Sequence, residues 1–197
     1  QQIAYEAADR FVMEGKRMPE LEKAPAVRSL MADLMDRAVN RKLMRIADKL
    51  SQVSADCAVQ LGISLYRHGF ILPAADRLLV LMKEGRLSAE GLYILGEIVY
   101  DKGHYSQAAG LFEAVLSEYS AHHRARIGVS LCYLQLAREL LADSLRKAPH
   151  HPAFHQDLKR VETSIALLEA TDWHTAWSAS ERRNMHAAPE DLFVHDR

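Results

Sequence analysis

The chain has 197 residues, of which 49% are hydrophobic and 26% are charged, and its formal net charge at pH 7 is -1. This balance allows a buried core, but it argues against a protein built mainly to hold nucleic acid, which needs a strongly basic surface. Nine glycines and six prolines are too few for a disordered or turn-dense all-β chain. No apolar run reaches the roughly 18 residues that a membrane span needs.

The first 54 residues show helical periodicity without a clear repeat. The pattern predicts a helix over 3–14, ended by Gly15, and a pair of helices over 26–37 and 38–50. This region reads as a divergent repeat or an N-terminal cap. The positions expected to be buried are Leu30, Leu34, Leu43, Ile46 and Leu50.

Residues 55–88 and 89–122 repeat each other at a spacing of 34 residues. Such a period is typical of stacked helical repeats. Expected N-cap serines, Ser54 and Ser88, precede the two units and follow the same shift. The matching pairs are Leu61-Gly62 with Leu95-Gly96, Gly69 with Gly103, Ala74-Ala75 with Ala108-Ala109, and Leu78 with Phe112.

Each unit predicts two helices that approach each other closely. In the first unit, apolar residues three and four apart predict a helix over 55–68, and a second helix is expected to start near Pro73. Gly69 allows the turn between them. Gly62 and Gly96 are small because neighbouring helices come close there, and the bulky side chains at 78 and 112 fill the remaining space.

Residues 55–122 resemble the tetratricopeptide repeat family, which has Leu-Gly early in the first helix and Ala with a bulky residue in the second. The resemblance implies an all-α, right-handed superhelical stack of antiparallel helix pairs over residues 1–171. It also implies a protein–protein interaction role as a scaffold or adaptor. The alternative within the family is a dedicated chaperone that sequesters a hydrophobic client.

A third unit over 123–151 departs from the repeat, because it is about five residues short and has no turn glycine. Two alternatives remain open. We favour two helices joined by a tight turn at 135–137, while fusion into one long helix would explain the same pattern.

The residues after Pro152 predict a helix to about residue 170 that seals the end of the stack. Its apolar face comprises Phe154, Leu158, Val161, Ile165 and Leu168. In the tail, 172–197, Trp173 and Trp177 are four residues apart. We expect the tail to fold back on its own stack; the alternatives are capture by another protein and disorder.

The sequence contains only weak motifs for catalysis or metal binding. His151 and His155 have helical spacing for a metal site, but no Cys pair or HExxH motif accompanies them and Pro152 lies between them. Cys57 has no nearby histidine in sequence. We therefore expect no enzyme activity, no cofactor and no metal. Two cysteines inside apolar patterns indicate a reducing compartment.

The resemblance also assigns residues to the concave face of the stack. A partner's helical or extended segment is expected to bind in this apolar groove. The open alternative is that flanking helices of the chain itself bury these side chains. The nine predicted partner-binding residues are Val59, Ile63, Tyr66, Tyr93, Glu97, Tyr100, Arg124, Ile127 and Leu131.

Overall fold

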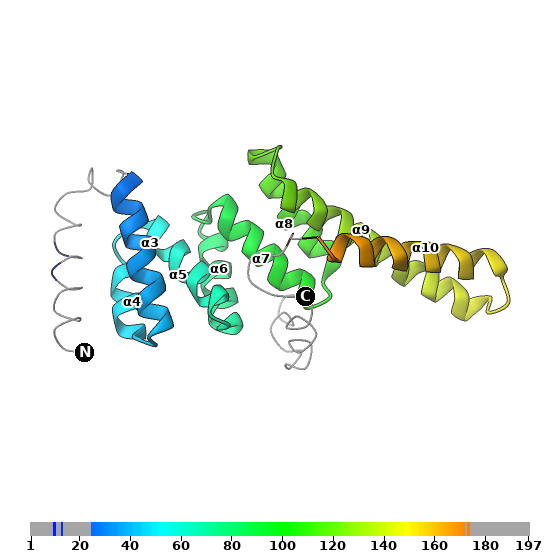
Figure 1. Cartoon of the computed structure of the whole chain (residues 1–197), viewed down its shortest axis with the longest axis horizontal. Coiled ribbons are helices and arrows are strands. Elements are labelled where there is room, and N and C mark those ends of the chain that lie inside the picture. Colours follow the sequence, from blue (N-terminus) through cyan, green and yellow to red (C-terminus); the bar gives the residue numbers. More distant parts are fainter. Residues whose placement is uncertain (1–9, 11–12, 14–24, 172, 174–197) are drawn as a thin grey trace. The chain divides into compact units, whose positions relative to one another are not determined.

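The structure, a computed structural model, describes residues 10, 13, 25–171 and 173, without the side chains of residues 25–28. Within this part of the chain every regular element is an α-helix (Figure 1). The helix predicted over 3–14 lies outside the described residues. The described helices are α3 (Pro25–Asn40), α4 (Met44–Ser51), α5 (Ala55–Arg67), α6 (Ile71–Lys83), α7 (Ala89–Asp101), α8 (Tyr105–Glu118), α9 (His123–Lys147) and α10 (Pro152–Glu169).

The chain divides into two compact units between Gly91 and Leu92, a point inside α7. The first unit contains α3 to α6, and the second contains most of α7 together with α8, α9 and α10. Each unit has its own buried apolar residues. The two units are therefore described separately. None of the described helices is both long and apolar enough to cross a membrane.

In the first unit, α5 is the central helix and packs against α3, α4 and α6. Gly62 on α5 lies opposite the fully buried Leu78 on α6, and a Cβ atom at position 62 would lie 2.6 Å from Leu78 Cδ2. Carbon atoms do not approach that closely, so a larger residue at position 62 would require the Leu78 side chain to shift. The predicted close approach at Gly62 is confirmed.

Local signals define the ends of these helices. The Ser54 hydroxyl accepts a hydrogen bond from the Cys57 N–H at 3.2 Å, which caps α5 as predicted. Gly69 has a φ of +83°, which allows the turn into α6. Helix α6 begins at Ile71, two residues before Pro73, so the proline lies in its first turn, where it is tolerated.

The first two described helices, α3 and α4, differ from the prediction in which face of α3 is buried and in where α3 ends. Leu30 is 50% exposed, whereas Met31, Met35 and Val39 are buried, so the expected burial of Leu30 is wrong. Two neighbouring faces of α3, one with Leu30 and one with Met31, both carry apolar residues. Because these faces differ by a shift of one residue, hydrophobic periodicity alone cannot predict which of them is buried. The break between helices falls at 41–43, where Lys42 has a φ of +57°, and not at 37–38. Leu50 is buried as expected.

In the second unit, the side chain of Phe112 on α8 is held between two glycines. A Cβ at Gly96 of α7 would lie 2.6 Å from Phe112 Cε1, and one at Gly128 of α9 would lie 2.8 Å from Phe112 Cδ2. Phe112 has no exposed surface. The two glycines therefore allow α7 and α9 to approach opposite edges of this ring, and the predicted close approach at Gly96 is confirmed.

Helix α9 runs unbroken for 25 residues from His123 to Lys147 (Figure 1). The favoured prediction of a turn at 135–137 is wrong, and the fused alternative describes the chain. Residues 134–141 (LQLARELL) contain no glycine or proline and consist of residues with high helix propensity. Nothing in this segment interrupts the hydrogen-bonded ladder, so the helix continues through the expected turn.

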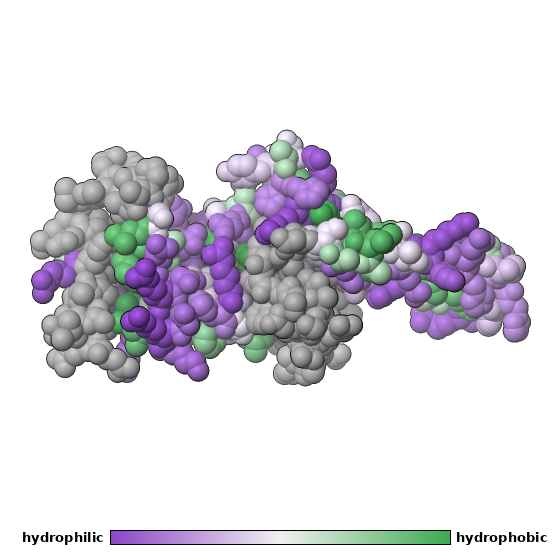
Figure 2. Space-filling view, in the orientation of Figure 1, coloured by the Kyte–Doolittle hydropathy of each residue, from purple (hydrophilic) through white to green (hydrophobic). Residues whose placement is uncertain are grey.

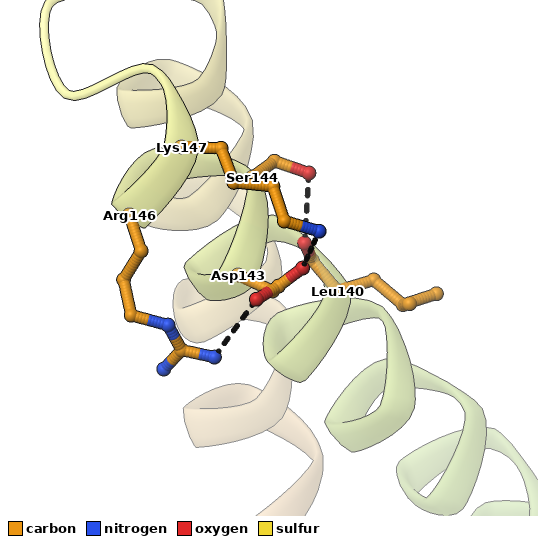
Figure 3. Close-up of polar contacts among 5 residues, drawn as sticks. All are labelled: Leu140, Asp143, Ser144, Arg146 and Lys147. Atoms are coloured by element: carbon orange, nitrogen blue, oxygen red, sulfur yellow. Dashed lines mark hydrogen bonds and ion pairs between the residues drawn. The ribbon is translucent and has the colours of Figure 1, made fainter.

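Ion pairs along the exposed face support the last turns of α9 (Figure 3). Asp143 pairs with Lys147 at 2.6 Å and with Arg146 at 3.1 Å, four and three residues onward. The hydrogen bonds from Lys147 and then Arg146 hold the pKa of the Asp143 carboxyl below its ordinary value. Leu140, which is 71% exposed, extends away from these residues.

Helix α10 lies alongside α9, as expected for a helix that covers the last face of the second unit (Figure 1). Ile165 is buried, and the other four residues of its predicted apolar face are half-buried. Figure 2 shows hydrophobic surface near the C-terminal end of α10, where Leu167 is 68% exposed. Helix α10 therefore also presents an apolar side chain to solvent at that end.

Gly96→Ala should lower the free energy of unfolding by about 1–3 kcal/mol, because the new methyl group must displace the Phe112 ring. Gly110→Ala is the matched control, since Gly110 lies inside α8 and a Cβ there would meet nothing within 4 Å. The control should stabilise the chain by about 0.5–1 kcal/mol through helix propensity. Urea unfolding followed by circular dichroism measures both. Equal effects at the two positions would contradict the close approach at Gly96.

Candidate functional site

The nine predicted partner-binding residues fall in both units. Val59, Ile63 and Tyr66 belong to the first unit, and the other six belong to the second. All are buried except Arg124, which is half-buried. Their surface is therefore covered within the chain itself, and partner binding at these positions stays a prediction.

The first unit has an open depression of about 530 Å³, but its lining contains none of the predicted partner-binding residues. Its charged side chains include Arg77, which pairs with Asp48, and Arg86, which pairs with Glu84 at 2.8 Å. These pairings leave a surface that mixes paired charged side chains with apolar ones. The lining residues are Ala58, Pro73, Asp76, Arg77, Val80, Leu81, Glu84 and Arg86.

The second unit holds an aromatic cluster at the predicted positions of α7. We call the side chains of Tyr93, Tyr100 and Phe112 the aromatic pocket. The Tyr93 and Phe112 ring centroids are 5.5 Å apart. The indole of Trp173, which follows α10 in the chain, fills this pocket. It meets Tyr100 at 5.2 Å and 84° and Phe112 at 6.2 Å and 77°, both edge-to-face arrangements favoured by aromatic quadrupoles.

A main-chain hydrogen bond accompanies these ring contacts. The Tyr93 hydroxyl donates to the carbonyl oxygen of Trp173. On its other side, the Tyr93 ring lies 5.0 Å from the imidazole of His122. His122 Nδ1 accepts a hydrogen bond from the Ala125 N–H at 3.0 Å and so caps the start of α9. The pocket thus holds both a side chain and the backbone of the segment that enters it.

A second polar connection joins three helices around Tyr100. Gln135 Nε2 on α9 donates to the Tyr100 hydroxyl at 3.0 Å, and that hydroxyl donates to Glu169 Oε1 on α10, also at 3.0 Å. Tyr100 and Gln135 are buried. Because buried polar groups are costly when unpaired, this chain of bonds fixes α10, and with it the start of the Trp173 segment, relative to α7.

Burial dominates the electrostatics of this cluster. It raises the pKa of the Tyr100 phenol far above its ordinary value, and the nearby Glu169 carboxylate raises it further. Burial also raises the pKa of Tyr105, whose ring lies 5.3 Å from that of Tyr100. Both phenols therefore stay protonated at neutral pH, and the Tyr100 hydroxyl serves as a hydrogen-bond donor to Glu169.

Two carboxylates lie on the same helix as the pocket. Glu97 is fully buried and Asp101 is 6% exposed, and both make polar interactions within the chain. Arg124 on α9 also has a polar interaction. The predicted face therefore combines aromatic surface with charged residues, as the sequence indicated, and each of these charged residues already has an interaction within the chain.

The described residues offer weak means for catalysis. Burial raises the pKa of the Cys132 thiol to about 12, so that this side chain is protonated at neutral pH. His155 Nε2 lies 2.8 Å from the Pro149 carbonyl oxygen, and His151 stacks on Phe154 at 4.3 Å. Both histidines thus have local partners, and the described residues contain no group of three or more metal-ligating side chains.

Comparison with protein-family models, with curated proteins and with solved structures found no match for this chain. The relation to tetratricopeptide repeats therefore stays a proposal that depends on the repeated residues themselves.

Sequence reasoning found the α7 residues of the pocket but missed how they are used. Trp173 was singled out for its spacing from Trp177, which lies outside the described residues, and folding back of the tail was expected. Trp173 meets that expectation, and the rest of the tail, residues 172 and 174–197, lies outside the described residues. Gly128 was overlooked, although a glycine inside a helix often signals close packing. The bonds of Gln135 and Glu169 to Tyr100 depend on tertiary contacts that no local pattern encodes.

Tyr100→Phe should lower the free energy of unfolding by about 1–3 kcal/mol, because it leaves the buried Gln135 amide without its acceptor. Tyr133→Phe is the matched control. Tyr133 also donates to a carboxylate, that of Glu113 at 2.8 Å, but its side chain is 54% exposed. That control should change stability by less than about 0.5 kcal/mol. Chemical denaturation compares the two, and an equally small loss from Tyr100→Phe would contradict a structural role for the three-helix connection.

Proposed function

We propose that this chain is a tetratricopeptide-like repeat protein that binds a segment of a partner protein and acts as a scaffold or adaptor subunit. The proposal includes right-handed superhelical stacking of its helix pairs. The aromatic pocket carries the proposal, because it receives a non-helical segment through both ring contacts and a main-chain hydrogen bond.

The repeated geometry supports the family relation. Gly62 lies against Leu78, and Gly96 lies against Phe112, so the same contact recurs at the 34-residue spacing. The residues involved are 16 positions apart in each case. Repeats of this kind bury their apolar faces against neighbours, and the inner helices of the stack present a surface for extended ligands.

The character of the pocket supports protein binding over catalysis. Tyrosine and phenylalanine side chains supply large, rigid contact area, and a tyrosine hydroxyl adds one directional hydrogen bond. The phenols of Tyr100 and Tyr105 are protonated because burial raises their pKa. These are properties of a recognition surface, and the residues predicted for the groove also include Arg124 on α9, which is half-buried.

Site-specific photo-cross-linking in the native source tests the proposal. We expect p-benzoylphenylalanine at position 124, on the predicted groove face, to capture a partner protein. The matched control is the same group at position 126, because Arg126 is exposed on the same helix and lies about 200° away around its axis. The captured protein should also co-purify with the unmodified chain at a fixed stoichiometry.

No capture at 124, or equal capture at 124 and 126, would overturn the assignment of the groove. The fate of the captured protein separates the two family roles. A scaffold remains with its partner in the assembled complex, whereas a chaperone is found only with the unassembled client.

A further inference from the structure

We propose that the aromatic pocket is a receptor for a tryptophan-bearing segment of a partner, and that Trp173 is a tethered internal competitor for it. This inference rests on the proposed binding function and specifies the chemistry of its ligand. It follows from how Trp173 reaches the pocket, what the pocket recognises, and how the segment is tethered.

Trp173 enters the pocket from outside the helical framework. Helix α10 ends at Glu169, and Ala170 and Thr171 after it are exposed. Their main-chain N–H groups donate to the carbonyls of Ala166 and Leu168, both in α10 itself. The indole, by contrast, has no exposed surface. Trp173 is therefore a buried side chain that follows an exposed stretch of main chain, and its departure would leave the bonds that end α10 in place.

Three contacts to Trp173 use general features of a peptide segment. Tyr100 and Phe112 meet the indole edge-to-face, and Tyr93 donates to the main-chain carbonyl of the same residue. A large aromatic side chain and a carbonyl in a non-helical backbone satisfy all three contacts. A partner segment that presents a tryptophan in the same backbone geometry offers the same groups, so it can replace Trp173 without any new recognition element.

The tether makes Trp173 an effective competitor. Only residues 170–172 separate it from α10, and a short linker keeps a ligand at an effective concentration in the millimolar range. An external segment binds only the fraction of molecules whose pocket is open, and its apparent affinity falls by that fraction. Removal of the indole should therefore strengthen external binding.

The first test is calorimetry with a blocked synthetic peptide that copies residues 168–176 (LEATDWHTA) and a control peptide with alanine in place of its tryptophan. The full-length Trp173→Ala variant should bind the tryptophan peptide at least about tenfold more tightly than the unsubstituted chain, and it should not bind the control. A folded Trp173→Ala variant that binds neither peptide, or both equally, overturns the inference.

A second measurement is needed in case Trp173→Ala does not fold. The chain has two tryptophans, so a Trp177→Phe variant labelled with 5-fluorotryptophan carries its only fluorine at Trp173. Titration with the unlabelled peptide to about 5 mM should move this fluorine resonance from its buried position to that of solvent-exposed indole. A resonance that does not move at that concentration overturns displacement.

The outcomes separate this inference from the proposed function. If cross-linking at position 124 still captures a partner while the peptide neither binds nor displaces Trp173, the groove is used but the pocket is sealed by a structural tryptophan. If the peptide binds and position 124 captures nothing, the pocket is a receptor and the groove assignment is wrong.

Discussion

The structure depends on one repeated contact, in which a bulky side chain fits directly against the backbone of a glycine on the preceding helix. In the first unit Leu78 lies against Gly62, and in the second Phe112 lies against Gly96. Any side chain at the glycine would lie within about 2.6 Å of the opposing group. Interiors are packed as densely as organic crystals, so this contact sets how closely the two helices can approach.

The candidate site is a consequence of the same contact. Phe112 is held between Gly96 and Gly128, and its ring then forms one wall of the pocket that receives Trp173. Tyr93 and Tyr100 belong to the same helix as Gly96, so the close approach that admits Phe112 also places their side chains around the indole. Packing of the repeat and formation of the pocket are therefore coupled: a shift of Phe112 would alter both.

Much of the fold could be predicted because its determinants are local. We could predict α5 to α8, and the close contacts at Gly62 and Gly96, from the spacing of glycine and alanine, the serine N-caps and the turn glycines. The buried face of α3 was predicted wrongly because the patterns that contain Leu30 and Met31 are equally apolar. The turn expected inside α9 was wrong because the family pattern was given more weight than the helix propensity of the residues. The pocket was anticipated only through the α7 tyrosines. Its occupant and the Gln135–Tyr100–Glu169 connection join residues far apart in the chain, and such contacts leave no local pattern in the sequence.

A double-mutant cycle between positions 96 and 112 tests the central contact most directly. Phe112→Val removes the three ring atoms, Cε1, Cδ1 and Cζ, that a Cβ at position 96 would meet. If the contact is as described, Gly96→Ala should cost at least about 1 kcal/mol less free energy of unfolding in the Phe112→Val background than in the unsubstituted chain. Additive effects, within about 0.5 kcal/mol, would show that the two positions do not constrain each other and would contradict the packing described for the second unit.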